Sequence, residues 1–357
     1  MAFRCDAGGH VGVGHFVRDL ALAQEISRRG GEVVFFGDVG RTPWAARQLG
    51  ELQVNIEDAP GQPEALARLA VQRGVSAIVL DGYDLDAGTG AALRAREVRV
   101  LAVVDGPFGA GQEADLYLDQ NLGAGRPPDV PDGSTVLVGP DYALFRDLVL
   151  DRRPAATVRA ARGERPPAVL AVFGGTDPYH AAETVVPLLL GTGLAMRVTA
   201  ITPHPGAHDV LAALPLGPGQ TVHRLPLVDD LPALVTRSDL VVSAAGTSVW
   251  ELCCLGAAAA LVCVTDNQEL GYRRVVQRRL ARGLGHLRDL AGPGPHREAA
   301  AGTLVELVRR TDLRRVLAAR GAALVDGRGR ERVADALLRG LRVTSDPAAP
   351  APSEGSR

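Results

Sequence analysis

Short apolar runs alternate with longer segments of helical period along most of this chain, and this alternation constrains the fold more than any other feature. The runs EVVFFGD, SAIVLDGY and RVLAVVDG are separated by helical stretches such as WAARQLGEL and PEALARLAVQRG. A second series contains AVLAVFGG, AMRVTAIT, TVHRLP, DLVVSAAG and AALVCVTD. Because parallel strands need a crossover helix between them, the pattern predicts an α/β protein with two doubly wound parallel sheets.

The interruption between the two series sets the predicted domain boundaries. At 357 residues the chain is long enough for two cores. We expect an N-terminal domain over 1–150 and a C-terminal domain over 168–342. Residues 151–167, DRRPAATVRAARGERPP, are rich in Arg and Pro and predict a linker, whereas 343–357 contain little to bury and predict a disordered tail.

Charge and composition exclude several functions. The net charge of −2 provides no field that would gather nucleic acid, so we expect no nucleic-acid partner. No apolar stretch approaches the roughly 20 residues of a membrane span, and no signal-type segment is seen, so we expect no transmembrane segment and a cytoplasmic location. We also expect a monomer.

All 39 basic residues are arginine, because the sequence contains no lysine. This absence excludes a P-loop lysine, a Schiff base and a lysine general base, so anions must be bound by arginine or by backbone amides. The four cysteines include no CxxC pair and lie mostly in apolar segments. We therefore expect neither a metal site nor a cofactor.

The first candidate site is the segment RCDAGGHVGVGHFVRDLALAQEI, in which a strand ends near Asp6, a glycine loop follows and a helix starts near His15. Glycines let backbone amides approach a ligand closely, and a helix start favours an anion. We assign Asp6, Gly12, Gly14 and Arg18 to substrate binding. The spacing is GxxGxG rather than GxGxxG, so it is a weak signal for a dinucleotide.

His15 is the candidate catalytic residue, because near neutrality an imidazole can take a proton from water. The alternative is a histidine that only caps the helix or hydrogen-bonds the loop. His10 could equally contact substrate or be solvated. Tyr83, in VLDGYD at the end of a strand, either faces the substrate or packs over the loop.

In the second half, two glycine turns follow strands. Gly174, Gly175 and Thr176 precede a helix predicted to begin near Pro178, and a similar turn precedes a second helix. Such turns can present amides and hydroxyls to a diphosphate. The residues of the second turn are Gly246, Thr247 and Ser248.

Three further polar residues complete the predicted nucleotide site. Glu251 either binds ribose hydroxyls or forms a capping box with Ser248. Asn267 and Gln268 follow another strand and could bind sugar or phosphate. The alternative is a simple Asn helix cap.

Taken together, the chain resembles the PseG/SpsG family of nucleotide-sugar hydrolases and spore-coat polysaccharide proteins, which are related to GT-B glycosyltransferases such as MurG. The likeness spans most of residues 2–285. It rests, in chain order, on RCDAGGHVGVGHFVR, VLDGYD, VVDG, LDQN, VGPDYALFR, VFGGTDP, SAAGTSVWELCCLG and DNQ.

The resemblance implies a GT-B arrangement, with two Rossmann-type domains facing a cleft and UDP bound mainly by the C-terminal domain. It implies that His15 is the catalytic base and that Glu251 binds ribose. The chain departs from the family where Asp105 is followed by Gly106 instead of a second Asp, and where alanines replace a proline after ELCCLG. Sugar specificity could differ accordingly.

Our hypothesis is a hydrolase that releases UDP from a UDP-linked di-N-acetylated trideoxyhexose, as in pseudaminic acid biosynthesis. The alternative enzyme is a glycosyltransferase that passes a similar sugar to an acceptor in surface-polysaccharide or natural-product biosynthesis, because a water and an acceptor hydroxyl make the same demand on a base. A nucleotide-sugar-binding protein without catalysis is the third possibility. A Rossmann oxidoreductase lacks its dinucleotide fingerprint.

Overall fold

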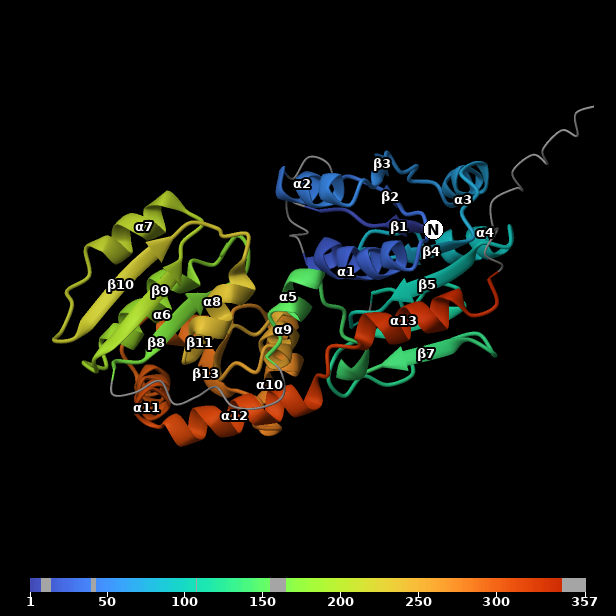
Figure 1. The fold of residues 1–357 in the computed structure, drawn as a ribbon. Coiled ribbons are helices and arrows are strands. Elements are labelled where there is room, and N and C mark those ends of the chain that lie inside the picture. Colours follow the sequence, from blue (N-terminus) through green and yellow to red (C-terminus); the bar gives the residue numbers. More distant parts are fainter. Residues whose placement is uncertain (8–13, 40–42, 107, 155–164, 342–357) are drawn as a thin grey trace, which may run out of the picture.

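A computed structural model describes residues 1–7, 14–39, 43–106, 108–154 and 165–341, and every structural statement below concerns these residues. The chain forms two α/β lobes joined by a narrow waist (Figure 1). His10, Gly12, most of the predicted linker 151–167 and the predicted tail 343–357 lie outside the described residues.

The first sheet has seven parallel strands in the order β3-β2-β1-β4-β5-β6-β7. Its central strands are apolar on both faces, as expected of a sheet covered by helices on two sides. The strands are β1 (Ala2–Arg4), β2 (Val34–Phe36), β3 (Asn55–Glu57), β4 (Ala77–Leu80), β5 (Arg99–Val103), β6 (Leu116–Asp119) and β7 (Thr135–Val138).

The second sheet has six parallel strands in the order β10-β9-β8-β11-β12-β13. The two sheets confirm the predicted α/β class with two doubly wound parallel sheets. The strands are β8 (Ala168–Val172), β9 (Met196–Ile201), β10 (Gln220–Leu225), β11 (Leu240–Ala244), β12 (Ala259–Cys263) and β13 (Arg282–His286).

Helices cover both faces of each sheet. On the first sheet, α1 (Gly14–Arg28), α2 (Pro43–Glu51) and α13 (Gly329–Leu338) share one core layer, and α3 (Pro63–Gln72) and α4 (Thr89–Arg94) share the other. On the second sheet one layer contains α6 (Ala181–Leu190), α7 (Pro205–Ala212), α11 (Pro295–Arg309) and α12 (Thr311–Leu324). The opposite layer contains α5 (Asp147–Asp151), α8 (Leu231–Arg237), α9 (Ser248–Cys254) and α10 (Glu269–Gln277). Three 3₁₀ turns are η1 (Pro140–Tyr142), η2 (Asp266–Gln268) and η3 (Leu287–Leu290).

Each sheet reverses its strand order once. In the first sheet the reversal lies between β1 and β4, and in the second between β8 and β11. The two helices that follow the strands on either side of a reversal lie on opposite faces of the sheet. These helices are α1 and α4 in the first sheet, and α6 and α9 in the second. We call the place where the strand order reverses the switch point of the sheet. Ligands of open α/β sheets bind there, beyond the carboxyl ends of the strands.

The chain passes from the first core to the second over residues 143–145, since Ala143 already packs in the second core. Leu144 packs in the core of the first sheet, and Phe145 packs with Val149 in the core of the second. The predicted boundary at 150 therefore lies after the crossing. Helix α5, which was assigned to the first domain, packs against α9 of the second.

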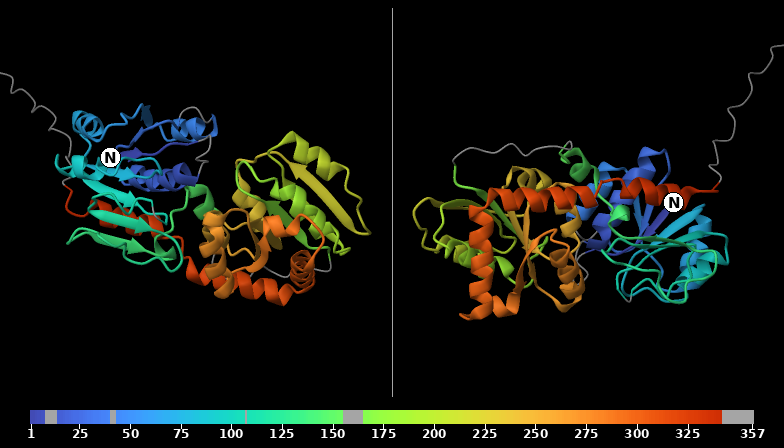
Figure 2. Two further views of the ribbon diagram at one scale, coloured as in Figure 1. Left: turned by 180° about the vertical axis from the view of Figure 1, so that it is seen from behind. Right: turned by 90° about the horizontal axis from the view of Figure 1, so that it is seen from below.

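A second crossing brings the C-terminal helix back. Val325 packs in the second core, whereas Val333, Ala334 and Leu337 of α13 pack in the first. Figure 2 shows α12 and α13 running from one lobe to the other. Residues 168–342 therefore do not form one unit, because the apolar face of α13 is covered by α1.

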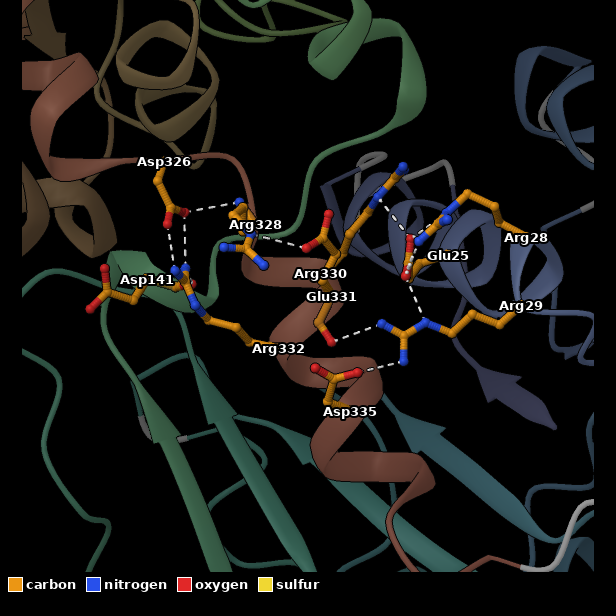
Figure 3. A network of polar contacts seen from close by, with 10 residues as sticks. All are labelled: Glu25, Arg28, Arg29, Asp141, Asp326, Arg328, Arg330, Glu331, Arg332 and Asp335. Atoms are coloured by element: carbon orange, nitrogen blue, oxygen red, sulfur yellow. Dashed lines mark hydrogen bonds and ion pairs between the residues drawn. The ribbon is translucent and has the colours of Figure 1, made fainter. Parts of the chain in front are cut away.

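An arginine network fastens α13 to the first lobe (Figure 3). Glu25 on α1 is fully buried and accepts hydrogen bonds from Arg28 and Arg29. Arg330 Nε lies 3.5 Å from Glu25, and Arg29 also donates to Asp335 at 2.6 Å. Removing one member of a buried ion pair typically costs about 3–5 kcal/mol, so this cluster holds the returning helix firmly.

Among the described residues, no helix is long and apolar enough to cross a membrane.

Candidate functional site

Three charged or titratable side chains meet at the switch point of the first sheet. His15 is the second residue of α1, Arg18 lies one turn later, and Asp81 directly follows β4. His15 Nδ1 lies 2.5 Å from Asp81 Oδ1, and Arg18 donates to both oxygens of Asp81 at 2.5 Å. The three residues are at most 6% exposed. His15 and Arg18 are therefore held by one carboxylate on the neighbouring strand.

The electrostatics of this cluster decide where the His15 proton lies. Burial disfavours the charged form of Asp81, but Arg18 and His15 outweigh it and hold the pKa of Asp81 well below its usual range. An ionised carboxylate only accepts hydrogen bonds, so the His15 bond to Asp81 requires a proton on Nδ1, a nitrogen that also lies 2.8 Å from Arg18 Nη2. In the neutral imidazole of that tautomer, Nε2 is the unprotonated nitrogen and can act as a base.

Tyr83 and Asp105 extend the cluster. The Tyr83 ring meets the His15 imidazole edge-on at 4.4 Å between centroids and contacts Phe108 at 4.2 Å. Asp105, after β5, lies 3.7 Å from Arg18 Nη1 and accepts a hydrogen bond from Asn121. Burial and the nearby Asp105 raise the pKa of Tyr83, so the phenol stays protonated beside His15.

The buried carboxyl of Asp19 lies behind this cluster. It is fully buried, and neither of its oxygens has a hydrogen-bond partner within the described part of the chain. Burial, reinforced by the charge of Asp81, raises the pKa of Asp19 well above its usual value. The first switch point therefore contains one carboxyl that is fully paired and one that is not.

Asp6 takes no part in the contacts of His15. Its Oδ1 accepts a hydrogen bond from the Asp38 amide at 2.8 Å, and its Oδ2 pairs with Arg4 at 2.9 Å. These bonds tie the end of β1 to the end of β2. Gly14 opens α1 and is exposed, and the predicted substrate-binding role of Gly12 falls on a residue outside the described ones.

At the second switch point, the turn after β8 differs from its prediction. Gly174 has φ 86°, a left-handed conformation that favours glycine, and Gly175 and Thr176 follow it. Helix α6 begins at Ala181 rather than near Pro178. The Asp177 carboxylate accepts hydrogen bonds from the amides of Ala181 and Ala182 at 2.8 and 3.0 Å. The Asp177 carboxylate thus occupies the first free amides of α6, whereas the amides of Gly174, Gly175 and Thr176 donate to no acceptor within the described residues.

The turn after β11 differs in that no described side chain caps the helix that follows it. Thr247 is the residue before α9, and its side chain forms no capping hydrogen bond. Within the described ranges, the amides of Gly246, Thr247 and Ser248 donate to no acceptor. The capping box considered for Glu251 is not formed. Glu251 is partly buried, and burial raises its pKa although the charge of Arg146 opposes the rise.

Asn267 and Gln268 lie in η2, directly after β12. Gln268 Oε1 accepts a hydrogen bond from the Val264 amide at 3.1 Å, and its Nε2 faces Gly246, where an added Cβ would lie 3.6 Å away. Asn267 Oδ1 accepts a hydrogen bond from the Thr265 hydroxyl. Gln268 therefore belongs to the same group of turns as Gly246.

The two switch points face each other across the waist. A Cβ added to Gly14 would lie 3.9 Å from Thr247 Oγ1, so the start of α1 in one lobe meets the turn before α9 in the other. Arg47 on α2 also pairs with Asp229 of the second lobe at 2.8 Å. The structure brings the predicted base and one predicted nucleotide-binding turn into one region.

One cluster has the residue types of a metal site. The ligand atoms of Cys263, Glu269 and His286 lie within 4.8 Å of one another. Glu269, however, already pairs with His286 and Arg273, and Cys263 donates to the Thr265 carbonyl. Burial raises the pKa of Cys263 to about 11, which disfavours the thiolate that a metal needs. The polar groups of this cluster therefore already pair with one another and with Arg273.

Two residues of this region were missed as site residues. Asp81 lies in the segment VLDGYD, which was placed at a strand end with only Tyr83 as a candidate, and Arg146 was not singled out. Asp81 lies 66 residues from His15, so only the pairing of β1 with β4 brings them together. The one signal available was the position of Asp81 at the carboxyl end of a predicted strand.

No protein-family model and no curated protein matches this chain. Solved structures do match it in fold. MurG from Acinetobacter baumannii has a TM-score of 0.69 at 18% identity, over 95% of this chain and 98% of its own. UDP-GlcNAc 2-epimerase from Neisseria meningitidis, bound to UDP-GlcNAc, has a TM-score of 0.63 at 12% identity, over 95% and 99%.

HepE from Anabaena, in complex with UDP, has a TM-score of 0.59 at 14% identity, over 95% of this chain and 99% of its own. At these identities the likeness concerns the fold. The chain has the GT-B-like fold of two parallel-sheet domains.

Proposed function

We propose that this protein is a nucleotide-sugar hydrolase that releases UDP from a UDP-linked sugar, with His15 as the general base. The observation that carries the proposal is the buried His15–Asp81 pair at one switch point, directly opposite the open Thr247 turn at the other. Such a pair leaves one imidazole nitrogen available to accept a proton.

We assign nucleotide binding to the second lobe and the base to the first. The second lobe offers unbonded amides and hydroxyls at Gly246–Ser248 together with the Glu251 carboxylate, groups that suit a diphosphate and ribose hydroxyls. Two structures of the same fold contain UDP or UDP-GlcNAc, which supports a uridine nucleotide as the ligand here. Asn267 and Gln268 would complete this side.

In the proposed reaction, His15 Nε2 takes a proton from water while the water oxygen bonds to the anomeric carbon. The bond between that carbon and the phosphate oxygen breaks, and UDP leaves with the electron pair, so the sugar is released with inversion. Asp81 holds the imidazole in the required tautomer and stabilises the imidazolium that forms. Arg18 keeps Asp81 ionised for this role.

The resemblance to the PseG/SpsG family supports a di-N-acetylated trideoxyhexose as the sugar. Gly14, Arg18 and Tyr83 would lie on the sugar side, since Tyr83 contacts His15 directly. Asp6 we assign a supporting role through its bonds to Arg4 and Asp38. A glycosyltransferase remains the alternative, because the same base would serve an acceptor hydroxyl.

The experiment mixes the protein with UDP-2,4-diacetamido-2,4,6-trideoxy-β-L-altrose without any acceptor and follows free UDP and free sugar by NMR. Equal release of both is the expected result. UDP binding without release would favour the transferase, which is then tested with added acceptor sugars. Absence of both binding and release, for this and other UDP-sugars, would contradict the proposal.

A further inference from the structure

Arg146 stands at the point where the chain crosses between the lobes. It precedes α5 and follows Phe145, which packs in the second core. It is only 8% exposed. Within the described residues, its guanidinium has no hydrogen-bond or ion-pair partner, and its Nε is fully buried without one.

Buried Nε atoms without a partner also occur in other arginines, but Arg146 differs from the other arginines of similar burial because, in the part of the chain that the structure describes, its whole guanidinium lacks a partner. The other buried arginines that the structure describes all have partners: Arg18 binds Asp81, Arg330 binds Asp147 at 2.6 Å, and Arg314 donates to the carbonyl of Leu307. Burying a charge without a partner is costly, so such a group normally has an acceptor. Arg146 has donors and no acceptor.

Its neighbours come from both lobes. The Arg146 guanidinium lies over the Trp44 ring of α2, 5.4 Å from the ring centre, and this stacking favours a cation. On the other side, Arg146 acts electrostatically on Glu251 of α9 without forming a hydrogen bond to it. Arg146 is therefore held against Trp44 and within electrostatic range of the carboxylate that we assign to the ribose.

We propose that Arg146 binds the phosphate groups of the nucleotide, donating from its guanidinium when the ligand is present. This inference rests on the proposed function and deepens it, because it names the cation that recognises the diphosphate. A planar guanidinium fork suits phosphate oxygens in a bidentate pair.

Two features of the chain favour an arginine in this role. The sequence contains no lysine, so every side-chain cation that is charged throughout the neutral range is an arginine. The start of α6, which was predicted to hold phosphate, is occupied by Asp177. Among the described arginines that are more than nine-tenths buried, Arg146 is the one whose guanidinium has no hydrogen-bond or ion-pair partner and can therefore match the diphosphate charge.

The test measures UDP and uridine binding by calorimetry for the wild type, Arg146→Gln and Arg146→Lys. Loss of a charge-assisted hydrogen bond weakens binding by roughly ten- to a hundredfold. We expect this loss for UDP in Arg146→Gln, a smaller loss in Arg146→Lys, and unchanged uridine binding in both. Arg152→Ala is the matched control, because Arg152 lies at the end of the same helix and already pairs with Asp230.

A merely structural role would weaken UDP and uridine alike, and that result would overturn the inference. Equal UDP affinity in folded Arg146→Gln and the wild type would overturn it too, while leaving the proposed function intact. If Arg146→Gln does not fold, the same comparison is made with Arg146→Lys, which keeps the charge over Trp44. If the wild type binds neither UDP nor uridine, both the inference and the proposed function fail.

Discussion

The two switch points of this molecule differ in their polar groups: the first has ionisable side chains that bond to one another, and the second has backbone amides without acceptors among the described residues. At the first, His15, Arg18 and Asp81 are buried, ionisable and bonded to one another before any ligand arrives. At the second, Gly246 and Thr247 leave their amides without an acceptor in the described structure. A group that transfers a proton needs a fixed orientation and tautomer, whereas a group that binds a phosphate needs unoccupied donors.

Removing the carboxylate of the first switch point tests the comparison most severely. We expect Asp81→Asn to lower turnover by roughly 10²–10⁴-fold, because the amide neither stabilises the imidazolium nor fixes its tautomer. Steady-state kinetics with a UDP-sugar measure the effect. Asp84→Asn, an exposed carboxylate in the same loop, should retain activity. Equal turnover in Asp81→Asn and the wild type would contradict a role for the pair.

The pH dependence of stability in the wild type and in Asp19→Asn tests whether the Asp19 carboxyl at the first switch point is unpaired. The folded-state pKa of Asp19 is raised by burial, so below the usual pKa of about 3.9 both the folded and the unfolded state carry the proton. Above it, the unfolded state loses the proton first, and the stability of the wild type falls by about 1.4 kcal/mol per pH unit up to the folded-state pKa. Asp19→Asn removes this loss.

Urea unfolding of both proteins between pH 4 and pH 8 measures the difference. We expect the two to have similar stability at pH 4 and the variant to be increasingly the more stable as pH rises. A constant difference across the range would show that Asp19 is paired.

At the second switch point, Glu251→Gln should weaken UDP and uridine binding about tenfold while leaving the turnover of bound substrate nearly unchanged. Burial raises the pKa of Glu251, so the carboxylate is lost at a higher pH than usual. Wild-type affinity should therefore weaken as pH falls from 7 to 5, and that of the variant should not. Calorimetry at both pH values checks this, and a pH-independent wild type would contradict it.

The smallest effect concerns the backbone of the second switch point. Gly174 has φ 86°, so Gly174→Ala should lower the free energy of unfolding by roughly 1 kcal/mol. Gly246→Ala is the matched control for stability, because its added Cβ would meet its nearest neighbour at 3.6 Å, an ordinary contact. Equal stability of the two variants would contradict the claim that the positive φ of Gly174 disfavours alanine.

Much of the fold could be predicted because it depends on local pattern. Apolar runs such as those of β4 and β11 are buried on both faces, and their alternation with helices implies parallel sheets. The same logic placed His15 and Thr247 after strands. The sheet on which a helix packs could not be predicted in the same way. The periodicity of α13 shows that it has an apolar face, but it does not show which sheet that face covers.

The candidate site was harder to predict where it depends on distant contacts. Asp81 meets His15 only through strand pairing, and Arg146 meets Trp44 only through the crossing of the chain. The start of α6 was misplaced because Asp177 and His180 adopt positive φ and Asp177 caps the helix three residues later than expected. Such strained conformations are not visible in composition or period.

The central claim is that the base and the nucleotide site belong to different lobes. It is tested most directly by measuring turnover and UDP affinity side by side for His15→Ala and the wild type. We predict that turnover falls by roughly 10²–10⁴-fold and that UDP affinity is unchanged, because His15 serves only the reaction. Full turnover in the variant, or a loss of UDP affinity that matches the loss of turnover, would contradict the account.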